Sequence, residues 1–217
     1  MEKIRILCYG DSNTWGYISG TDHQRYGDGE RWTKLLASLL GDGFEVIEEG
    51  LNSRTLLSID PRPGREGRRG LDYLIPCLDT HDPIDLVILM LGTNELKASY
   101  GRSSEWIGDT LEEYFVKTIL GRRSQLRGAR PKLLIVAPPA VDGTRECCAK
   151  GGIYEGAPQK SVELEGIYRG IAERRDCLFL SALPLATGVD GVHLTAESHR
   201  RLAGMLCERI KEEFRRE

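Results

Sequence analysis

Short apolar runs recur along this chain and alternate with segments of helical periodicity. Several of the runs are continuous rather than alternating, which is typical of strands that are covered on both faces, as in a parallel sheet between helices. The predicted strands are Ile4–Tyr9, Phe44–Glu48, Asp85–Leu91, Lys132–Ala137 and Cys177–Leu180.

Between these runs, apolar residues three and four positions apart predict amphipathic helices. One helix is expected to end at Gly41, because glycine often terminates helices. The last helix is expected to begin after Thr195, a residue type that caps helix N-termini. The apolar positions are Trp32, Leu35, Leu36, Leu39 and Leu40; Leu111, Tyr114, Phe115, Thr118 and Ile119; Leu164, Ile167, Tyr168 and Ile171; and Leu202, Met205, Leu206 and Ile210.

The alternation of strands and helices predicts a doubly wound α/β fold with a parallel sheet. No linker or internal repeat interrupts it, so residues 1–217 are interpreted as a single domain, a common size for this class. The stretches 57–70 and 138–158 are rich in Gly, Pro and charge. Loops of this length serve as lids or binding loops nearly as often as they form plain surface.

The composition excludes several classes of function. The chain has 40% hydrophobic residues, 29% charged residues and a net charge of −3. This charge balance gives no electrostatic attraction to nucleic acid or to an anionic membrane. No run of ~18 apolar residues could span a bilayer, and no secretory leader precedes the first strand, so the cytoplasm is the expected location. The six cysteines and four histidines lack zinc-binding spacing, so no metal and no cofactor are expected. Adjacent Cys147 and Cys148 are interpreted as free thiols rather than a redox pair.

The candidate chemistry follows the predicted strands, because sites in doubly wound sheets form at the carboxyl ends of strands. A serine hydroxyl needs a base, and that base needs an orienting partner. Asp190 and His193, with two residues between them in one loop, can supply both to Ser12. The segments concerned are Gly10-Asp11-Ser12-Asn13-Thr14, Gly50-Leu51-Asn52-Ser53-Arg54-Thr55, Gly92-Thr93-Asn94-Glu95 and Asp190-Gly191-Val192-His193.

These four segments resemble, in order and in position, the four sequence blocks of the SGNH (GDSL-type) hydrolase family. The resemblance runs from Ile4 to about Leu206 and is greatest for the bacterial arylesterase and acyltransferase group, which includes perhydrolase-like enzymes. The stretches that carry it are ILCYGDSNTWGY, ERWTKLLASLLG, FEVIEEGLNSRT, IDLVILMLGTNELKA and DGVHLT.

The resemblance implies a three-layer α/β/α, flavodoxin-like fold with a five-stranded parallel sheet. It also implies a cofactor-free serine esterase that cleaves small aryl or alkyl esters through an acyl-serine intermediate. Members of the group also transfer acyl groups to alcohols or peroxide, and they assemble into homo-octamers, so a homo-oligomer is expected here.

Carried over residue by residue, the resemblance predicts a triad of Ser12, His193 and Asp190. It predicts an oxyanion hole from the Ser12 and Ser53 backbone N–H groups and the Asn94 side chain. Ser53 stands where the wider family has glycine and could crowd the hole. Glu95 replaces the usual aspartate, and its role is left open.

Other residues near these blocks have two interpretations each. Asn13, Trp15 and Tyr17 are candidates for the substrate pocket, although core packing of Trp15 or Tyr17 is about as well supported. Arg54 could hold an anionic substrate group, but a structural ion pair is favoured. The arginines at 62, 65, 68 and 69 are interpreted as a solvated loop rather than an anion site. His199 is a rival base, but it lies inside a predicted helix.

Alternative functions remain within and outside this class. A carbohydrate O-deacetylase, a lysophospholipase or a thioesterase could use the same fold. An α/β-hydrolase needs GxSxG and a nucleotide-binding module needs GxGxxG or GxxxxGK[ST], and the chain has none of these motifs. A catalytically silent binding protein would lack a triad member, and none is missing. The natural substrate is left open by the sequence.

Overall fold

All five strands form a single parallel sheet in a computed structural model that describes residues 2–215. The strand order is β2-β1-β3-β4-β5, which is the order of flavodoxin-like folds. The predicted α/β fold with a five-stranded parallel sheet is therefore confirmed. The strands are β1 (Ile4–Gly10), β2 (Phe44–Gly50), β3 (Leu86–Met90), β4 (Lys132–Ala137) and β5 (Leu178–Ser181).

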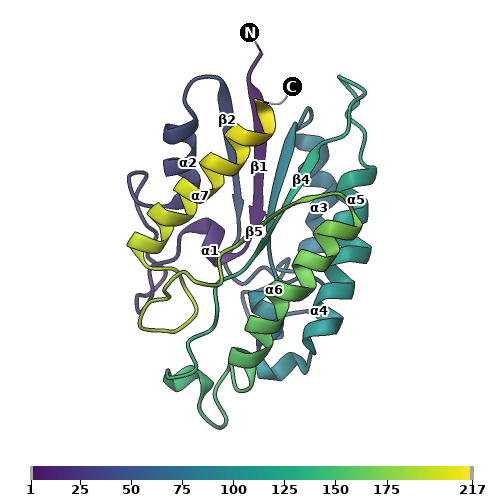
Figure 1. The fold of residues 1–217 in the computed structure, drawn as a ribbon. Coiled ribbons are helices and arrows are strands. Elements are labelled where there is room, and N and C mark those ends of the chain that lie inside the picture. Colours follow the sequence, from purple (N-terminus) through teal and green to yellow (C-terminus); the bar gives the residue numbers. More distant parts are fainter. Residues whose placement is uncertain (1, 216–217) are drawn as a thin grey trace.

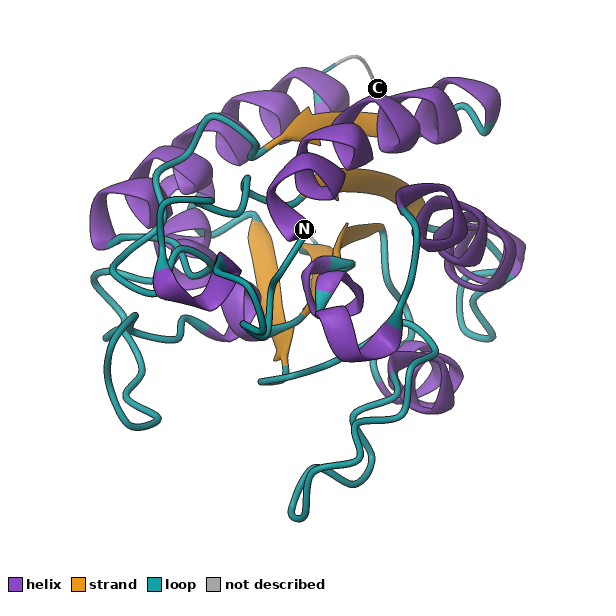
Figure 2. Cartoon of the chain, turned by 90° about the horizontal axis from the view of Figure 1, so that it is seen from below, coloured by secondary structure: helices purple, strands orange, loops and turns teal. Residues whose placement is uncertain are grey.

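Helices lie on both faces of this sheet, which makes three layers (Figures 1 and 2). The α-helices are α1 (Ser12–Trp15), α2 (Trp32–Leu40), α3 (Gly70–Thr80), α4 (Ser104–Thr110), α5 (Lys117–Gly121), α6 (Ala157–Arg174) and α7 (Ala196–Phe214). The short helical segments are the 3₁₀ turns η1 (Thr93–Leu96), η2 (Ala98–Tyr100) and η4 (Glu146–Cys148), and the π-helical η3 (Leu111–Val116).

Two apolar clusters, one on each side of the sheet, form the core. On one side, α2 and α7 pack together and bury Trp32 and Leu202 against strand residues such as Ile88. On the other side, α3, α4, η3 and α6 bury residues such as Leu74 and Tyr168. The central strand β3 is buried at every position, which explains why its apolar run is continuous.

Local sequence signals account for the ends of the predicted helices. The Thr195 side chain accepts a hydrogen bond from the Ser198 N–H at 3.1 Å and caps α7. Gly41 ends α2 with φ +80°, a backbone conformation that favours glycine. Both predicted ends are confirmed.

Two elements differ from the sequence prediction. Helix α3 was not expected, and it starts at the last residue of the 57–70 stretch. Its Pro76, which removes one backbone N–H donor from the helix, lies on the exposed side. The apolar pattern at 111–119 is not a simple α-helix, because it passes through η3 before continuing as α5.

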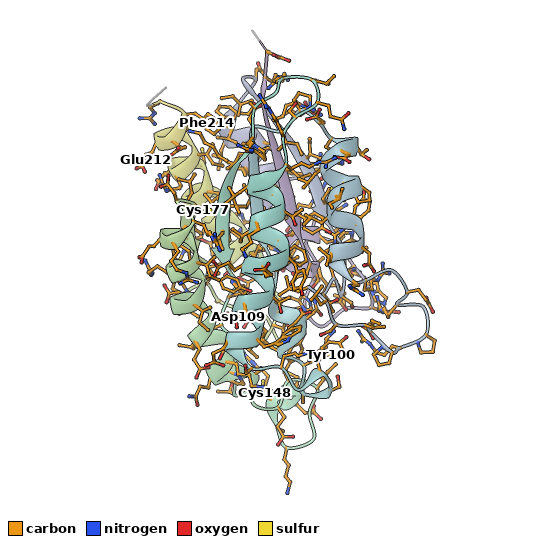
Figure 3. The ribbon with its side chains drawn as sticks, turned by 90° about the vertical axis from the view of Figure 1, so that its right-hand side faces the viewer. Tyr100, Asp109, Cys148, Cys177, Glu212 and Phe214 are labelled. Carbon is orange, nitrogen blue, oxygen red and sulfur yellow. The ribbon has the colours of Figure 1, made fainter. Side chains whose placement is uncertain are left out.

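The carboxyl ends of the parallel strands, together with the long loops, define one end of the molecule. Figure 3 places Tyr100 of η2 and Cys148 of η4 at this end, opposite Glu212 and Phe214 at the end of α7. Within residues 2–215, no helix is both long and apolar enough to cross a bilayer.

Candidate active site

Ser12 lies directly beyond the carboxyl end of β1, as the first residue of the one-turn helix α1. The tight turn into α1 depends on Gly10, because a Cβ there would lie 2.0 Å from the Thr14 Oγ1 and 2.8 Å from the Met90 carbonyl oxygen. The Asp11 side chain accepts a hydrogen bond from the Asn13 N–H at 2.9 Å and caps the turn. The Ser12 hydroxyl is thereby held at a fixed position beside the strand ends.

His193 contacts Ser12 from a loop 181 residues away in the sequence. Its Nε2 lies 2.8 Å from the Ser12 Oγ, and its Nδ1 lies 2.7 Å from the Asp190 Oδ2. Since a carboxylate can only accept, Nδ1 carries the proton, and the unprotonated Nε2 faces the hydroxyl. The arrangement can therefore move the Ser12 proton to His193. The structure brings together all three residues of the predicted triad.

Asp190 is oriented by the turn that it begins. Its Oδ1 accepts the backbone N–H groups of Val192 and His193, both at 3.0 Å, while its own N–H donates to the Ser19 Oγ at 2.9 Å. Burial raises the pKa of the Asp190 carboxyl, but the hydrogen bonds and charge of His193 outweigh burial and hold the pKa well below its usual range. Asp190 therefore stays ionised while it orients the imidazole.

Two residues that follow Ser12 hold His193 in place. The Tyr17 ring lies against the imidazole, with 4.4 Å between the ring centroids. The Asn13 amide donates to the Val192 carbonyl at 3.2 Å and accepts the Leu194 N–H at 2.9 Å, so it brackets the backbone of His193. Asn13 is fully buried and does not line the cavity, which corrects its predicted place in the substrate pocket.

The cavity beside Ser12 has a volume of about 190 Å³ and collects residues from most of the strand-end loops. Ser53 and Asn94 line it together with Ser12, so the three predicted oxyanion-hole residues share one space. Tyr17 lines it as predicted, but Trp15 does not. The lining residues are Ser12, Tyr17, His23, Asn52, Ser53, Arg62, Arg65, Asn94, Lys97, Ile153, Tyr154 and His193.

The conformation of Ser53 explains why a glycine would suit this position. Its backbone φ is +65°, in the left-handed region that residues other than glycine rarely adopt. The Ser53 Oγ lies 3.4 Å from an Arg62 guanidinium nitrogen, so the side chain contacts the 57–70 loop. The Asn94 amide donates to the neighbouring Arg54 carbonyl at 3.0 Å, which fixes its orientation.

Glu95, whose role the sequence left open, supports this loop from inside the protein. It is fully buried, and its Oε1 accepts the N–H groups of Leu56 at 2.7 Å and Ser58 at 3.4 Å. Burial raises the pKa of Glu95 to about 7, although these backbone donors and Lys97 oppose the increase.

Several cavity residues were not predicted from the sequence. Lys97, Tyr154 and His23 were not predicted to lie there, and Arg62 and Arg65 were expected in a solvated loop. The Arg62 guanidinium forms a short ion pair with Asp60 at the cavity edge. A signal for Lys97 was present, because it lies three residues after Asn94.

Other candidates lie outside the cavity. Arg54 is buried, donates to the Gly10 carbonyl at 2.9 Å and pairs with Glu49, in keeping with the favoured structural interpretation. His199 accepts the Trp32 N–H through Nδ1 at 3.3 Å, and burial lowers its pKa to about 3, so it cannot serve Ser12 as a base. Cys147 and Cys148 are free thiols, and Cys147 donates to the Asp190 carbonyl at 3.2 Å.

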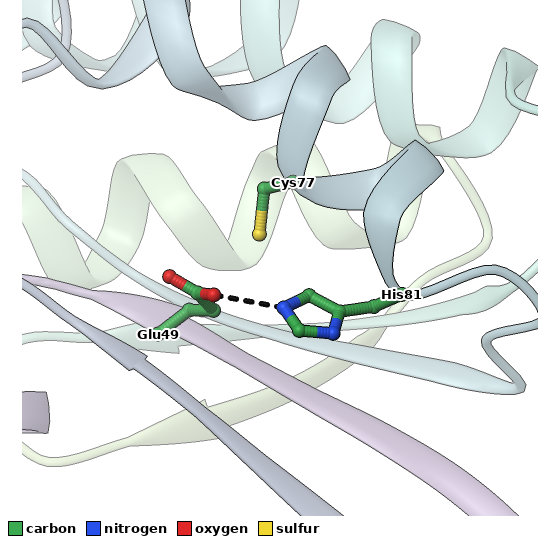
Figure 4. Close-up of side chains that lie close together, drawn as sticks. All are labelled: Glu49, Cys77 and His81. Carbon is green, nitrogen blue, oxygen red and sulfur yellow. Dashed lines mark hydrogen bonds and ion pairs between the residues drawn. The ribbon is translucent and has the colours of Figure 1, made fainter.

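Among the described residues, one group has potential ligand atoms close enough together to suggest a metal site. It consists of Glu49, Cys77 and His81 (Figure 4). The His81 Nε2 lies 2.8 Å from the Glu49 Oε1. The chemistry fits a metal poorly, because burial raises the pKa of the Cys77 thiol to about 12 and the Arg54 guanidinium lies 4.0 Å from Glu49. We interpret the cluster as a structural hydrogen-bond group.

Comparisons with known proteins agree with this geometry. Residues 8–201 match the model of the GDSL-like lipase/acylhydrolase family. Among solved structures, the native aryl esterase of M. smegmatis is 38% identical, with 96% of this chain and 99% of that chain covered and a TM-score of 0.87. A carbohydrate acetylesterase from Sinorhizobium meliloti is 34% identical, with 97% and 99% covered and a TM-score of 0.85.

A putative arylesterase from Agrobacterium tumefaciens is 32% identical, with 96% of this chain and 99% of that chain covered and a TM-score of 0.84. The search of curated proteins gave no significant match. The family match spans most of the chain, and the similar structures from M. smegmatis and Sinorhizobium meliloti are named as esterases. The chain therefore belongs to the GDSL-like lipase/acylhydrolase family and is a carboxylic ester hydrolase.

Proposed function

We propose that this enzyme hydrolyses small carboxylic esters through an acyl intermediate on Ser12. The observation that carries the proposal is the continuous hydrogen-bond chain from the Ser12 Oγ to the His193 Nε2 at 2.8 Å and from the His193 Nδ1 to Asp190 at 2.7 Å. A cavity of about 190 Å³ beside this chain suits a short ester better than a long acyl chain.

In the first half of the reaction, the Ser12 Oγ attacks the ester carbonyl carbon while the His193 Nε2 accepts the hydroxyl proton. The carbonyl oxygen becomes an oxyanion, for which the Ser12 N–H, the Ser53 N–H and the Asn94 amide are the proposed donors. The C–O bond to the alcohol then breaks, and His193 returns the proton to the leaving oxygen. Water, activated by His193, releases the acid and regenerates Ser12.

Hydrolysis of p-nitrophenyl esters from acetate to decanoate, in a buffer with EDTA, tests this proposal. Ser12→Ala should lower kcat by roughly 10⁴-fold or more, and adding Asp190→Asn should reduce it little further, because the triad acts as a unit. Ser38→Ala, on the exposed side of α2, is the matched control. A serine-directed organophosphate should label Ser12, and a label on another serine would refute the assignment.

Carbohydrate O-deacetylation is a second candidate, and it is favoured by the similarity to the Sinorhizobium acetylesterase. Acetyl is the smallest common acyl group and would fit the cavity. An acetylated sugar should then be deacetylated faster than p-nitrophenyl acetate at matched concentration.

We also propose that the enzyme forms homo-oligomers, with eight subunits as the leading expectation, and that its acyl-enzyme transfers acyl groups to alcohols as well as to water. Exposed Ile59, Ile153 and Val189 lie on the loops that carry cavity or triad residues. Subunit contacts at these loops would exclude water from the acyl-enzyme and favour an alcohol as acceptor.

A further inference from the structure

Lys97 lines the cavity, and almost all of the residue is shielded from bulk water. Only 6% of the residue is exposed. The 3₁₀ turn η1 explains its position, because residues three apart lie on the same side of a 3₁₀ helix. The Lys97 N–H donates to the Asn94 carbonyl at 3.3 Å, so both side chains line the cavity while Glu95 is directed into the protein.

The Lys97 ammonium has no close polar partner in the part of the chain that the structure describes. Among residues 2–215, no carboxylate lies within 4.0 Å of its Nζ and no hydrogen bond from it is formed; the Tyr100 ring lies beside it, 5.9 Å from Nζ to the centroid. Asp60, Glu95 and Asp11 favour its charge from a longer distance. The stem of Lys97 is buried while its ammonium faces the cavity, so its hydrogen-bond acceptors must come from water or a ligand in the cavity rather than from the described protein groups.

The rest of the cavity adds positive charge. Arg62 and Arg65 line it as well, and the Arg62 charge is largely compensated by Asp60. Burial, with a contribution from Arg62, lowers the pKa of Lys97 to about 8, so the ammonium is still mostly charged near neutral pH. An anion small enough to share the cavity with an ester would give this ammonium a close partner of opposite charge.

We propose that the preferred substrates are esters that also carry a carboxylate, and that Lys97 binds this carboxylate while Ser12 attacks the ester carbonyl. This inference rests on the proposed function of Ser12 and adds the class of substrate. A carboxylate carries the opposite charge to the Lys97 ammonium and offers acceptor oxygens, so the charge-assisted hydrogen bond between them would be strong inside the cavity. If Lys97 served only to balance Asp60, Glu95 and Asp11, the enzyme would show no such preference.

Matched esters test the proposal. Monoethyl succinate and ethyl 4-oxopentanoate have nearly the same shape, and only the first carries a carboxylate; monoethyl glutarate and ethyl 5-oxohexanoate form a longer pair. The readout is the ratio of kcat/KM for the charged ester to that for the neutral ester. We expect a ratio of roughly tenfold or more for at least one pair in the wild type.

Lys97→Met should reduce this ratio to near one, mainly through KM of the charged ester, and Lys97→Arg should keep most of the preference. Lys3→Met, which removes the same charge at an exposed position before β1, should leave the ratio unchanged. A wild-type ratio near one, or a ratio that Lys97→Met does not change, would overturn the proposal. Failure to cleave any of the esters would instead contradict the proposed function.

The pH dependence of the wild-type ratio gives a test that needs no variant. The charged groups that act on Lys97 are Arg62 and Asp60 from the 57–70 loop, Asp11 before α1, and Glu95 of η1. Between pH 7.5 and 9.5 the substrate carboxylate stays ionised and Lys97 loses its proton, so the ratio should fall. Effects of pH on the triad act on both esters and cancel. A ratio that stays constant over this range would refute the role of Lys97.

Discussion

Replacing Glu95 with Gln should change how the stability of this enzyme depends on pH. Glu95 is fully buried, one of its oxygens accepts backbone N–H groups, and the other has no partner among the described residues. Burial raises its pKa from 4.5 to about 7 in the folded protein. Gln has no titrating proton, and its amide oxygen can still accept the Leu56 N–H. The variant therefore removes the titration but keeps the main hydrogen bond.

The raised pKa of Glu95 determines whether stability rises or falls with pH. As pH rises above 4.5, the unfolded chain releases the Glu95 proton, but the folded protein holds it until about pH 7. The wild type therefore loses stability across this range, and the loss is complete above it. A pKa that rises from 4.5 to about 7 on folding corresponds to about 3 kcal/mol, most of which develops between pH 5 and pH 8.

Urea unfolding at pH 5, 6, 7 and 8 measures this difference. The free energy of unfolding of Glu95→Gln, relative to that of the wild type, should increase by about 2 to 3 kcal/mol from pH 5 to pH 8, which means that the variant becomes relatively more stable. Glu173→Gln removes the same charge from an exposed position in α6 and should show no such trend. A difference between Glu95→Gln and wild type that stays constant within about 0.5 kcal/mol would refute the reasoning.

Two further outcomes are expected. Asn13→Ala removes both hydrogen bonds that bracket His193. The variant should therefore have a kcat lower by roughly tenfold or more, a nearly unchanged KM and a stability loss of about 1 to 3 kcal/mol. An unchanged kcat would show that Asn13 does not position His193. Light scattering at micromolar concentration should show a homo-oligomer, with eight subunits expected, and a monomer would contradict the proposed assembly.

The strands were predictable because burial on both faces leaves a simple pattern. Every residue of β3 is buried, so its sequence is uniformly apolar and cannot be mistaken for a surface segment. The edge strand β2 is only half-buried, and its predicted end at Glu48 falls two residues short of Gly50. Strand ends depend on hydrogen bonding to the neighbour, which the sequence of one strand does not contain.

Helix α3 could not be predicted from local preferences, because both its first residue and Pro76 disfavour a helix. It forms because Leu74, Cys77 and Leu78 are buried against the sheet, and this packing outweighs the weak preference. The π-helical turn at Leu111–Val116 is a similar case, since a helix register that changes by one residue has no signature in apolar spacing.

In the site, residues within family blocks were predictable, but the direction of their side chains was not. Asn13 and Tyr17 both follow Ser12 closely, yet only Tyr17 lines the cavity. The short helix α1 turns Asn13 into the protein, where it bonds to the His193 loop instead of facing a substrate. The local backbone geometry thus gives Asn13 and Tyr17, which lie four positions apart, different roles in the site.

The segment after β3 shows why the position of Lys97 in the cavity was not predicted, although the neighbouring Asn94 was predicted to belong to the site. A lysine near a loop is expected to be solvated, and nothing in the residue itself indicates burial. The information lies in the spacing: in a 3₁₀ turn, residues three apart share a side, so Asn94 at the cavity implies Lys97 at the cavity. The same turn directs Glu95 inward, where it supports the 56–58 backbone. The turn η1 and the residue that directly follows it therefore supply a proposed oxyanion donor and the cation that we propose selects the substrate.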